Sequence, residues 1–421
     1  MSDRAPDLRP THSREAAKGF LGNEWLITLA GAAVLMITMG SRQSLGLFIS
    51  SLQGSTGLGI TTISLAFAVA QLMWGVIQPI AGAAADRHGP ARILVAGLVV
   101  LAIGLAMTPL MKSGFGLIVA LGILSAIGSG AASFSVLIGA VAQHLASEKR
   151  GRAAGIINAG GSFGQFIFAP ITQVLIQLLG WMGAMWALAA ITLGALPFVK
   201  SLTPVGAMGS STVVARPSPW RAAQDAIEDR SYLLLNLGFF TCGFHIAFLV
   251  THLPGQVSLC GLPPAVASWS LALIGLANVG GSLIAGWCTQ RFRSKYILAT
   301  MYGSRVLLIG WYLTAPKTAW TFYCFAVGLG LTWLATVPPT AGLVGKLFGT
   351  RYLTTLFGLT LLSHQIGGFL GAWLGGVAMA RLGSYDWVWY ADIALALGAA
   401  LISLPIEEAV PMRLVPQRAA A

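Results

Sequence analysis

Charged residues are scarce in this sequence. Only 9% of the 421 residues are Asp, Glu, Lys or Arg, whereas 56% are hydrophobic and the mean hydropathy is +0.78. A soluble chain carries roughly 25% charged residues, and a large buried core does not account for so wide a difference. The shortage of charge excludes an ordinary soluble protein and predicts an all-α protein that crosses a membrane many times.

Cysteine pairs and enzyme motifs are also missing. The four cysteines lie in or beside apolar segments without a CxxC pair, so neither a metal site nor a disulfide framework is expected. The sequence shows no HExxH, no GxSxG and no embedded pair of carboxylates, which argues against an enzyme. The polar first 23 residues do not resemble a cleaved signal peptide. We therefore expect no cofactor, no metal and no catalytic residues.

Twelve apolar segments follow one another along the chain. Each is long enough to cross the hydrocarbon core as a helix, which takes about 17–25 residues. The segments are, in order, 25–52, 61–84, 93–111, 115–143, 153–179, 181–199, 231–255, 264–288, 296–315, 319–345, 353–380 and 387–405. An even number of spans places both ends of the chain on the same side of the membrane.

The net charge of +12 is concentrated in alternate gaps between these segments. The two tails and every second gap together hold 20 of the 25 Lys and Arg residues. Positive residues favour cytoplasmic loops, so we expect a multi-pass protein of the cell inner membrane with both termini in the cytoplasm. Topology thus explains the basic character, and no nucleic-acid partner is expected.

The longest interior polar stretch divides the twelve segments into two halves. It is rich in Pro, Ser and charge, which is typical of a linker. The expected parts are a cytoplasmic tail at 1–24, a six-helix domain at 25–200, a linker at 201–230, a second six-helix domain at 231–405 and a cytoplasmic tail at 406–421.

The two halves also resemble each other in sequence. GIINAGGSFGQFIFA at 155–169 aligns with GLTLLSHQIGGFLGA at 358–372, which places Gly164 on Gly367. Because each half has an even number of spans, both halves have the same orientation in the membrane. The repeat therefore predicts two pseudo-symmetric six-helix bundles related by an axis along the membrane normal.

The loop between the second and third segments reads GAAADRHGPAR. Together with twelve spans and the 6+6 repeat, it resembles the signature of the major facilitator superfamily, approximately G-x-L-A-D-x-x-G-R-[RK]. The residues that match are Gly82, Asp86, Arg87, Gly89 and Arg92. Pro90 stands where a basic residue is usual. The resemblance implies the major facilitator fold, with Asp86, Arg87 and Arg92 as a conformational latch. The alternative is an ordinary short basic loop.

A narrower resemblance is found in the first segment. SRQSLGLF at 41–48 looks like the first helix of monocarboxylate transporters and their bacterial relatives, including the oxalate–formate antiporter group. Arg42 falls where mammalian members have a lysine implicated in substrate and proton coupling. Those transporters usually carry a carboxylate-binding charge in their eighth helix, whereas the eighth segment here has none and offers Asn278. Arg42 is therefore expected to carry more of the substrate's charge.

Embedded acidic residues are also expected to be absent. No Asp or Glu is predicted in the middle of a segment, and Asp392 is placed near the outer part of the last one. A proton-driven cation exporter normally needs an embedded carboxylate, so this absence favours an anionic substrate. The guanidinium of Arg42 could bind a carboxylate with two hydrogen bonds at membrane depth. Alternatively, its long side chain could extend outward to the membrane interface.

Histidine is the predicted proton carrier. His245 in the seventh segment and His364 in the eleventh could each titrate near physiological pH, but they could equally be hydrogen-bonded packing residues. For Arg305 in the ninth segment, a structural partner and a ligand contact both remain open.

Uncharged polar and aromatic residues complete the predicted site. Trp74 and Trp333 could shape a cavity for an apolar substrate body, and Pro338–Pro339 could form a gating bend. Most of these residues could instead hold helices together. The predicted substrate-binding residues are Arg42, Gln43, Gln71, Trp74, Asn158, Gln165, His245, Asn278, Trp333, Thr336, His364 and Gln365.

These observations favour a secondary active transporter that moves a small organic anion, a monocarboxylate in particular, by alternating access. Proton symport and anion exchange both remain open. The alternative is an efflux pump for hydrophobic or amphipathic compounds, and a sensor without transport activity is a third option. The expected partners are the substrate anion, a co-transported proton and the lipid bilayer, with no obligate protein partner.

Overall fold

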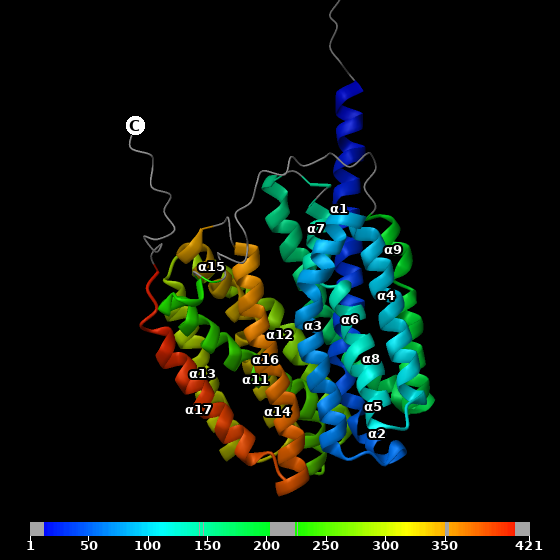
Figure 1. Ribbon diagram of the computed structural model, residues 1–421, viewed down its shortest axis with the longest axis vertical. Helices are drawn as coiled ribbons and strands as arrows, with labels where there is room; N and C mark the ends of the chain where they lie inside the picture. The colour runs from blue at the N-terminus through cyan, green and yellow to red at the C-terminus, as the bar shows by residue number, and fades with distance from the viewer. Residues whose placement is uncertain are drawn as a thin grey trace, which may run out of the picture.

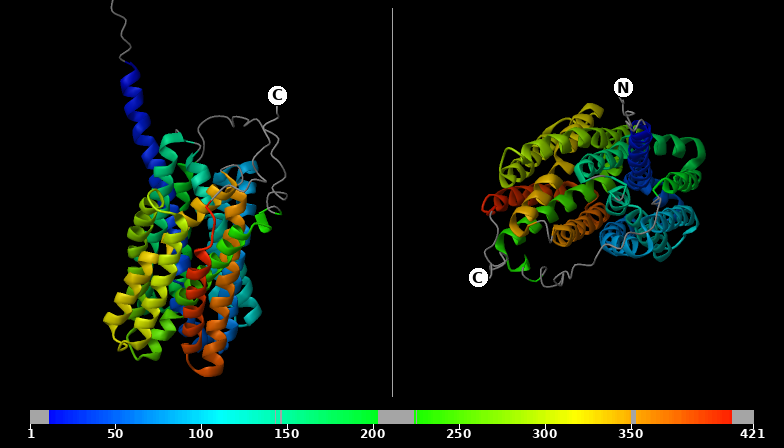
Figure 2. Two further views of the ribbon diagram at one scale, coloured as in Figure 1. Left: turned by 90° about the vertical axis from the view of Figure 1, so that its left-hand side faces the viewer. Right: turned by 90° about the horizontal axis from the view of Figure 1, so that it is seen from above.

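Every element that the structure describes is a helix or a short connection between helices. The computed structural model describes residues 12–142, 144–145, 147–202, 224, 226–349 and 353–408 (Figure 1). The helix axes are roughly aligned, successive long helices run up and down, and the first half of the chain lies beside the second half (Figure 2). The protein is therefore a bundle of helices in two adjacent halves.

The first six predicted segments correspond to helices of the first half. Several segments are interrupted: η1 and η2 are 3₁₀-helices, and η3 is a π-helix. In chain order the elements are α1 (His12–Gln43), η1 (Leu45–Phe48), α2 (Ile49–Thr56), α3 (Ile60–His88), α4 (Pro90–Met107), η2 (Thr108–Leu110), α5 (Gly114–Leu117), η3 (Ile118–Leu124), α6 (Ser125–Ala131), α7 (Phe134–Ala142), α8 (Ser147–Leu193) and α9 (Leu196–Lys200).

The last six predicted segments correspond to helices of the second half. Only the tenth segment is interrupted, by the 3₁₀-helix η4. The elements are α11 (Arg230–Leu259), α12 (Pro264–Thr289), α13 (Ser294–Thr314), α14 (Ala319–Thr332), η4 (Leu334–Thr336), α15 (Val337–Phe348), α16 (Leu353–Leu382) and α17 (Asp386–Ser403).

The element α8 contains the fifth and sixth predicted segments on either side of a turn. Gly180, between them, has φ 68° and ψ 170°, a conformation that glycine adopts without the cost of a Cβ. A straight helix of 47 residues would be about 70 Å long, more than twice the hydrocarbon thickness of about 30 Å. The turn at Gly180 therefore separates two membrane-spanning helices.

Nine helical stretches among the described residues are long and apolar enough to cross a membrane. One of them, Ala153–Lys200, includes the turn at Gly180 and so holds two predicted segments. α13 and α16 are not among the nine, but their 21 and 30 residues suffice to span the hydrocarbon core. These helices confirm the predicted fold class, an all-α membrane protein.

Buried apolar side chains form separate clusters in the two halves. One cluster draws its members from residues 27–202, apart from Ala247 and Ala372. The other two clusters draw theirs from residues 226–406, apart from Leu47 and Ala169. Each half therefore has its own core, and the bounds of the predicted domains at 25–200 and 231–405 stay a prediction.

The sequence repeat is visible as a repeated contact between helices. Gly164 of α8 packs on the carbonyl oxygen of Met36 in α1, and Gly367 of α16 packs on the carbonyl oxygen of Phe240 in α11. A Cβ atom at either glycine would collide with that carbonyl oxygen. The aligned glycines thus allow the same close approach of two helices in each half.

Gly367→Ala is expected to lower the free energy of unfolding by about 1–3 kcal/mol, because its methyl group forces α11 and α16 apart. Unfolding followed by intrinsic fluorescence in detergent measures this loss. Gly358→Ala, on the same helix, is the matched control, since no described atom lies within 4 Å of a Cβ there. Equal stability of the two variants would contradict the packing argument.

The two halves meet in the middle of the bundle and at one end. We call the end formed by α2 and the C-terminal turns of α11 and α16 the distal end (Figure 1). The opposite end, where α1 begins, is the proximal end. At the distal end Gly46 of η1 lies against the backbone of Val250 in α11. In the middle Gly75 of α3 lies against Gln365 of α16, and Gly275 of α12 lies against Gln165 of α8.

Toward the proximal end the same helix faces are uncovered. Gly82 lies 7 residues after Gly75, Gly286 lies 11 residues after Gly275, and Gly358 lies 7 residues before Gln365. Each spacing is nearly a whole number of helical turns, so the two residues of each pair lie on the same face of their helix. No described atom lies within 4 Å of a Cβ built at any of these three glycines. The halves are therefore in contact at the distal end and separate toward the proximal end.

Parts of the expected organisation lie outside the described residues. These are residues 1–11 of the predicted tail at 1–24, most of the predicted linker at 201–230, and residues 409–421 of the predicted tail at 406–421. The helix α1 begins at His12, within the predicted first tail, and extends beyond the rest of the bundle at its proximal end (Figure 1).

Candidate functional site

Arg42 lies at the end of α1, just before the chain tightens into η1. It is half-buried, and its Nη2 donates a hydrogen bond to Oε1 of Gln71 on α3. Its Cζ atom lies 4.5 Å from the ring centroid of Trp74, one turn further along α3. The cation is thus stabilised by an amide oxygen and an aromatic face, both uncharged.

No ion pair to Arg42 is found among the residues that the structure describes. A guanidinium inside a membrane protein costs several kcal/mol unless it is compensated, and an amide oxygen compensates it less than a carboxylate does. Arg42 therefore retains the capacity to bind an anion.

The second half of the chain covers Arg42's neighbours. Gln365 of α16 is 2% exposed and packs on Gly75, directly after Trp74. A Cβ at Gly368 would lie 3.6 Å both from Oε1 of Gln365 and from Cβ of Gln71. We call Arg42, Gln71, Trp74 and Gln365 the Arg42 cluster, which draws residues from both halves.

Three further predicted residues lie in the first half, and one of them, Gln165, contacts the second half. Gln165 of α8 is 1% exposed, packs on Gly275 of α12, and has no described hydrogen-bond partner at either amide atom. Asn158, on the same helix, is half-buried, and Gln43 is buried beside Arg42 in sequence. Gln165 is the one of these three that offers an unsatisfied buried amide between the halves.

Asn278, Trp333 and Thr336 have packing roles instead of facing the Arg42 cluster. Oδ1 of Asn278 accepts a hydrogen bond of 3.1 Å from the backbone N–H of Leu334, in the break between α14 and α15. Trp333 is buried in the core of the second half, and Thr336 donates to its carbonyl oxygen at 3.0 Å. These three side chains stabilise the interruption of the tenth segment, which begins before Pro338–Pro339.

Arg305 has a structural partner. It is 1% exposed, and its Nη2 donates to the carbonyl oxygens of Thr332 at 2.7 Å and Trp333 at 3.3 Å. These carbonyls end α14, where the negative end of the helix dipole favours a cation. Arg305 therefore caps a helix that stops inside the membrane, away from the Arg42 cluster.

The expectation of no embedded carboxylate is wrong. Asp392 is fully buried near the middle of α17, and its Oδ2 accepts a hydrogen bond from Nδ1 of His245 in α11. The sequence placed Asp392 too close to the membrane surface because the local hydropathy does not show that a distant histidine covers it. An anionic substrate is consequently indicated by Arg42 and no longer by a missing acid.

His245 and His364 lie at different places in the second half. His245 is 1% exposed and faces α17 through its contact with Asp392. His364 of α16 is half-buried, with its ring 4.8 Å from that of Phe239 and close to the thiol of Cys242. The structure brings neither imidazole into contact with Arg42 among the described side chains.

The sequence as a whole identifies the family that this architecture belongs to. Residues 31–372 match the Major Facilitator Superfamily, which is far more than half of the chain. The chain belongs to the Major Facilitator Superfamily. It is therefore a multi-pass membrane protein and a secondary transporter of a small molecule, not an enzyme.

Other members of the superfamily resemble the chain along most of its length. Monocarboxylate transporter 13 of Rattus norvegicus is 25% identical, over 94% of this chain and 91% of its own. The oxalate:formate antiporter of Oxalobacter formigenes is 20% identical, over 87% of each chain. The crystal structure of a D-xylose-proton symporter superimposes with a TM-score of 0.73 at 15% identity, over 92% of this chain and 98% of that chain, which supports the fold alone.

The superfamily motif at 82–92 lies at the proximal end, where α3 ends at His88 and α4 begins at Pro90. Arg87 and Arg92 are exposed there, and the side chain of Asp86 lies outside the described ones. The latch formed by these three residues stays a prediction.

Among the described residues no three His, Cys, Asp or Glu side chains come together as a metal site.

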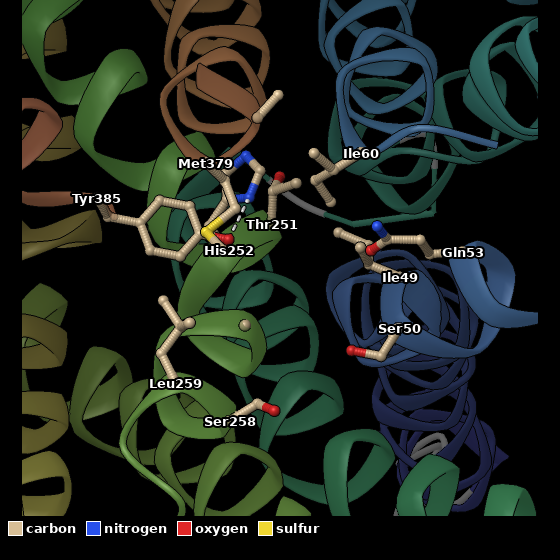
Figure 3. Close-up of a pocket in the computed structure, with 12 residues that line it drawn as sticks. Ile49, Ser50, Gln53, Ile60, Thr251, His252, Ser258, Leu259, Met379 and Tyr385 are labelled. Atoms are coloured by element: carbon tan, nitrogen blue, oxygen red, sulfur yellow. Dashed lines mark hydrogen bonds between the residues drawn. The ribbon is translucent and has the colours of Figure 1, made fainter. Parts of the chain in front are cut away.

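A cavity of about 330 Å³ lies between the halves at the distal end (Figure 3). Gln53 of α2 faces it from the first half, and Thr251, His252 and Tyr385 face it from the second (Figure 3). Burial raises the pKa of Tyr385 to about 12, so its hydroxyl stays protonated and donates to Nδ1 of His252 at 3.4 Å. Sequence reasoning missed this cavity because its lining residues come from both halves of the chain and do not themselves form a motif.

Proposed function

We propose that this superfamily member transports a small organic anion, specifically a monocarboxylate, and binds it at the Arg42 cluster. The observation that carries the proposal is a half-buried guanidinium between the two halves whose described partners are uncharged. A carboxylate would replace the oxygen of Gln71 as the acceptor and form a charge-assisted pair with Arg42. Trp74 would contact the apolar part of the substrate.

The named relatives support this chemistry. Two of them are called a monocarboxylate transporter and an oxalate:formate antiporter, and both names refer to carboxylates. At 20–25% identity these names suggest a class of substrate and leave its size and shape open. The eighth segment has no charged residue, and its Asn278 accepts a hydrogen bond from Leu334. Arg42 is therefore the principal positive group for the substrate.

The proposed transport cycle is a rocking of residues 25–200 against 231–405. The basic loops lie at the proximal end, so we place this end and both termini in the cytoplasm of a cell whose inner membrane holds the protein. The structure then corresponds to the state closed toward the outside. Either proton symport or anion exchange would return the empty site, and Asp86, Arg87 and Arg92 would hold the cytoplasmic loops in one state.

A binding experiment with the purified protein tests the substrate class. Thermal unfolding is recorded with monocarboxylates (formate, acetate, lactate, pyruvate), dicarboxylates (oxalate, succinate) and cations (tetraphenylphosphonium, ethidium). A ligand at 100 times its Kd should stabilise the native state by about 2.7 kcal/mol. We expect stabilisation by at least one monocarboxylate. Stabilisation by the cations alone would contradict the proposal and favour efflux of amphipathic compounds.

Arg42→Gln is expected to weaken binding of the stabilising carboxylate by about 10- to 150-fold, because hydrogen bonds to a charged group contribute about 1.5–3 kcal/mol. Titrations of the variant in the same thermal assay measure the change. The matched control is Arg291→Gln, since Arg291 also lies over a tryptophan ring, 4.2 Å from the centroid of Trp287. If Arg42→Gln binds the carboxylate as well as the control does, Arg42 is not the anion site.

A further inference from the structure

We infer that the coupled proton is carried by His245 in its pair with Asp392, at a site inside the second half that is separate from the substrate site. The inference rests on the proposed function, because it supplies the proton coupling of that transport. It also assigns a role to the embedded carboxylate that the sequence did not reveal. His364, the other predicted carrier, becomes part of the connection between the two sites.

The geometry leaves one nitrogen of His245 free to gain and lose a proton. His245 lies at the middle of α11 and is buried together with Asp392. Its Nδ1–H donates to Oδ2 of Asp392, which fixes the tautomer, while Nε2 has no described hydrogen-bond partner. A proton taken up at Nε2 converts the ring into an imidazolium whose charge the neighbouring carboxylate stabilises.

Unsatisfied polar atoms surround this pair. Oδ1 of Asp392 and both Nε and Nη1 of Arg305 are buried without a described hydrogen-bond partner. Buried polar atoms rarely stay unpaired, and internal water supplies such partners where space allows. The cluster of His245, Asp392 and Arg305 therefore has the composition of a hydrated proton site.

The charges around the pair favour a site that alternates between two protonation states. With neutral His245, Arg305 and Asp392 balance each other, and a proton on His245 adds one positive charge. Arg305 interacts electrostatically with Asp392, so a third charged group lies close to the pair. The other titratable groups that face this region are Cys242 on α11, Tyr302 on α13 and His364 on α16.

The proton site and the Arg42 cluster lie on opposite faces of α11. Ala247 packs into the core of the first half, near Gln71. His245 precedes it by two residues, which is a rotation of about 200° around the helix. His245 consequently does not touch a substrate bound at Arg42, and the proton and the anion occupy different sites.

Polar side chains connect the two sites. Cys242 lies about one turn before His245 and close to both Arg305 and His364. His364 is followed by Gln365, which packs on Gly75 in the first half. A movement of α16 against α3, as the halves rock, would therefore change the surroundings of His364 and the access of water to His245.

His252, on the same helix, differs from His245 because both of its ring nitrogens have hydrogen-bond partners. It is equally buried, but its Nε2–H donates to the carbonyl oxygen of Ala372 at 2.7 Å and its Nδ1 accepts from Tyr385. Both ring nitrogens are thus engaged with uncharged partners. His252 supplies a matched control for every experiment on His245.

The first experiment detects the proton directly and needs no substrate. The protein, labelled with ¹⁵N in its six histidines, is reconstituted in liposomes and examined by solid-state NMR as a function of pH. We expect the signal that is missing in His245→Gln to change from the Nδ1–H tautomer to the doubly protonated ring. The signal of His252 should keep one tautomer. A His245 signal that never gains the second proton would overturn the inference.

Asp392→Asn provides a second variant in case His245→Gln does not fold. It preserves shape and removes the balancing charge, so the doubly protonated form of the His245 signal is expected to be lost. Retention of that form in Asp392→Asn would overturn the role of the carboxylate. Size-exclusion chromatography verifies that each variant is folded before it is measured.

The second experiment links the proton to transport. Proteoliposomes are tested with radiolabelled lactate for uptake driven by a proton gradient and for exchange at equal pH. His245→Gln and Asp392→Asn are expected to lose accumulation and keep exchange, whereas His252→Gln should keep both. Accumulation by the His245 and Asp392 variants would overturn the inference. If even the wild type transports no carboxylate, the proposed function fails, and the NMR result still decides the proton site.

Discussion

Gly46→Val is expected to shift the protein about 5- to 150-fold toward the state with its distal end open, and to slow transport through a complete cycle correspondingly. Gly46 lies in η1, and a Cβ there would collide with the carbonyl oxygen of Val250 on the opposite half. A backbone oxygen cannot turn aside as a flexible side chain would. The collision exists only while the two halves touch, so the variant destabilises one state of the cycle and leaves the separated state unaffected.

The size of the effect follows from the cost of the collision. Overpacking by an added side chain costs about 1–3 kcal/mol, and a difference of that size changes the ratio of two conformations by about 5- to 150-fold. Valine is chosen because its branched side chain also meets the carbonyl of Thr251, 3.3 Å from the Cβ position. A transporter restricted to one state binds substrate from one side and does not release it on the other.

Spin labels at Gln53 and Ser258 measure this shift, since the two residues face each other across the distal cavity (Figure 3). The labels are placed in a background with Cys260, Cys288 and Cys324 replaced by serine. Gly46→Val should lengthen the distance between the labels, whereas Gly54→Val, in an exposed position with no described atom within 4 Å, should not. An unchanged distance in Gly46→Val would show that the distal contact is not a gate.

Most of the fold could be predicted from the sequence because it depends on local hydropathy. All twelve segments correspond to helices, and the glycine repeat corresponds to a repeated helix contact. The breaks at η1 and η4 were not predicted at their actual places. A 3₁₀-helix and an α-helix need the same apolar residues in a membrane, so composition alone does not distinguish them. The break at η4 depends on Asn278 and Arg305, which are distant in sequence.

The candidate site was harder to predict because its contacts join distant residues. Arg42, Gln71 and Trp74 were all candidates, but the sequence did not show that they touch one another. The pair of His245 and Asp392 is 147 residues apart. Sequence reasoning found the histidine and placed the acid near the outer part of the last segment. Depth along a helix can be estimated from sequence, whereas the side that a polar residue faces depends on its partner.

Arg305→Leu is expected to destabilise the protein by about 3–5 kcal/mol, the loss found when one partner of a buried charge pair is removed. The change removes the hydrogen bonds to the carbonyl oxygens of Thr332 and Trp333, which end α14 inside the membrane. It also removes the positive charge of Arg305 that interacts with Asp392. Leucine is shorter than arginine, so the cavity left where the guanidinium lay adds to the electrostatic loss.

A double-mutant cycle separates the two contributions. If part of the loss comes from an uncompensated Asp392, then adding Asp392→Asn to Arg305→Leu should recover about 0.5–3 kcal/mol, the range of coupling between neighbouring charged groups. Unfolding titrations in mixed micelles give the four free energies. Arg293→Leu, an exposed arginine just before α13, should change stability by less than about 0.5 kcal/mol. Strict additivity of Arg305→Leu and Asp392→Asn would mean that Arg305 acts on α14 alone, and that His245 and Asp392 form a proton site without it.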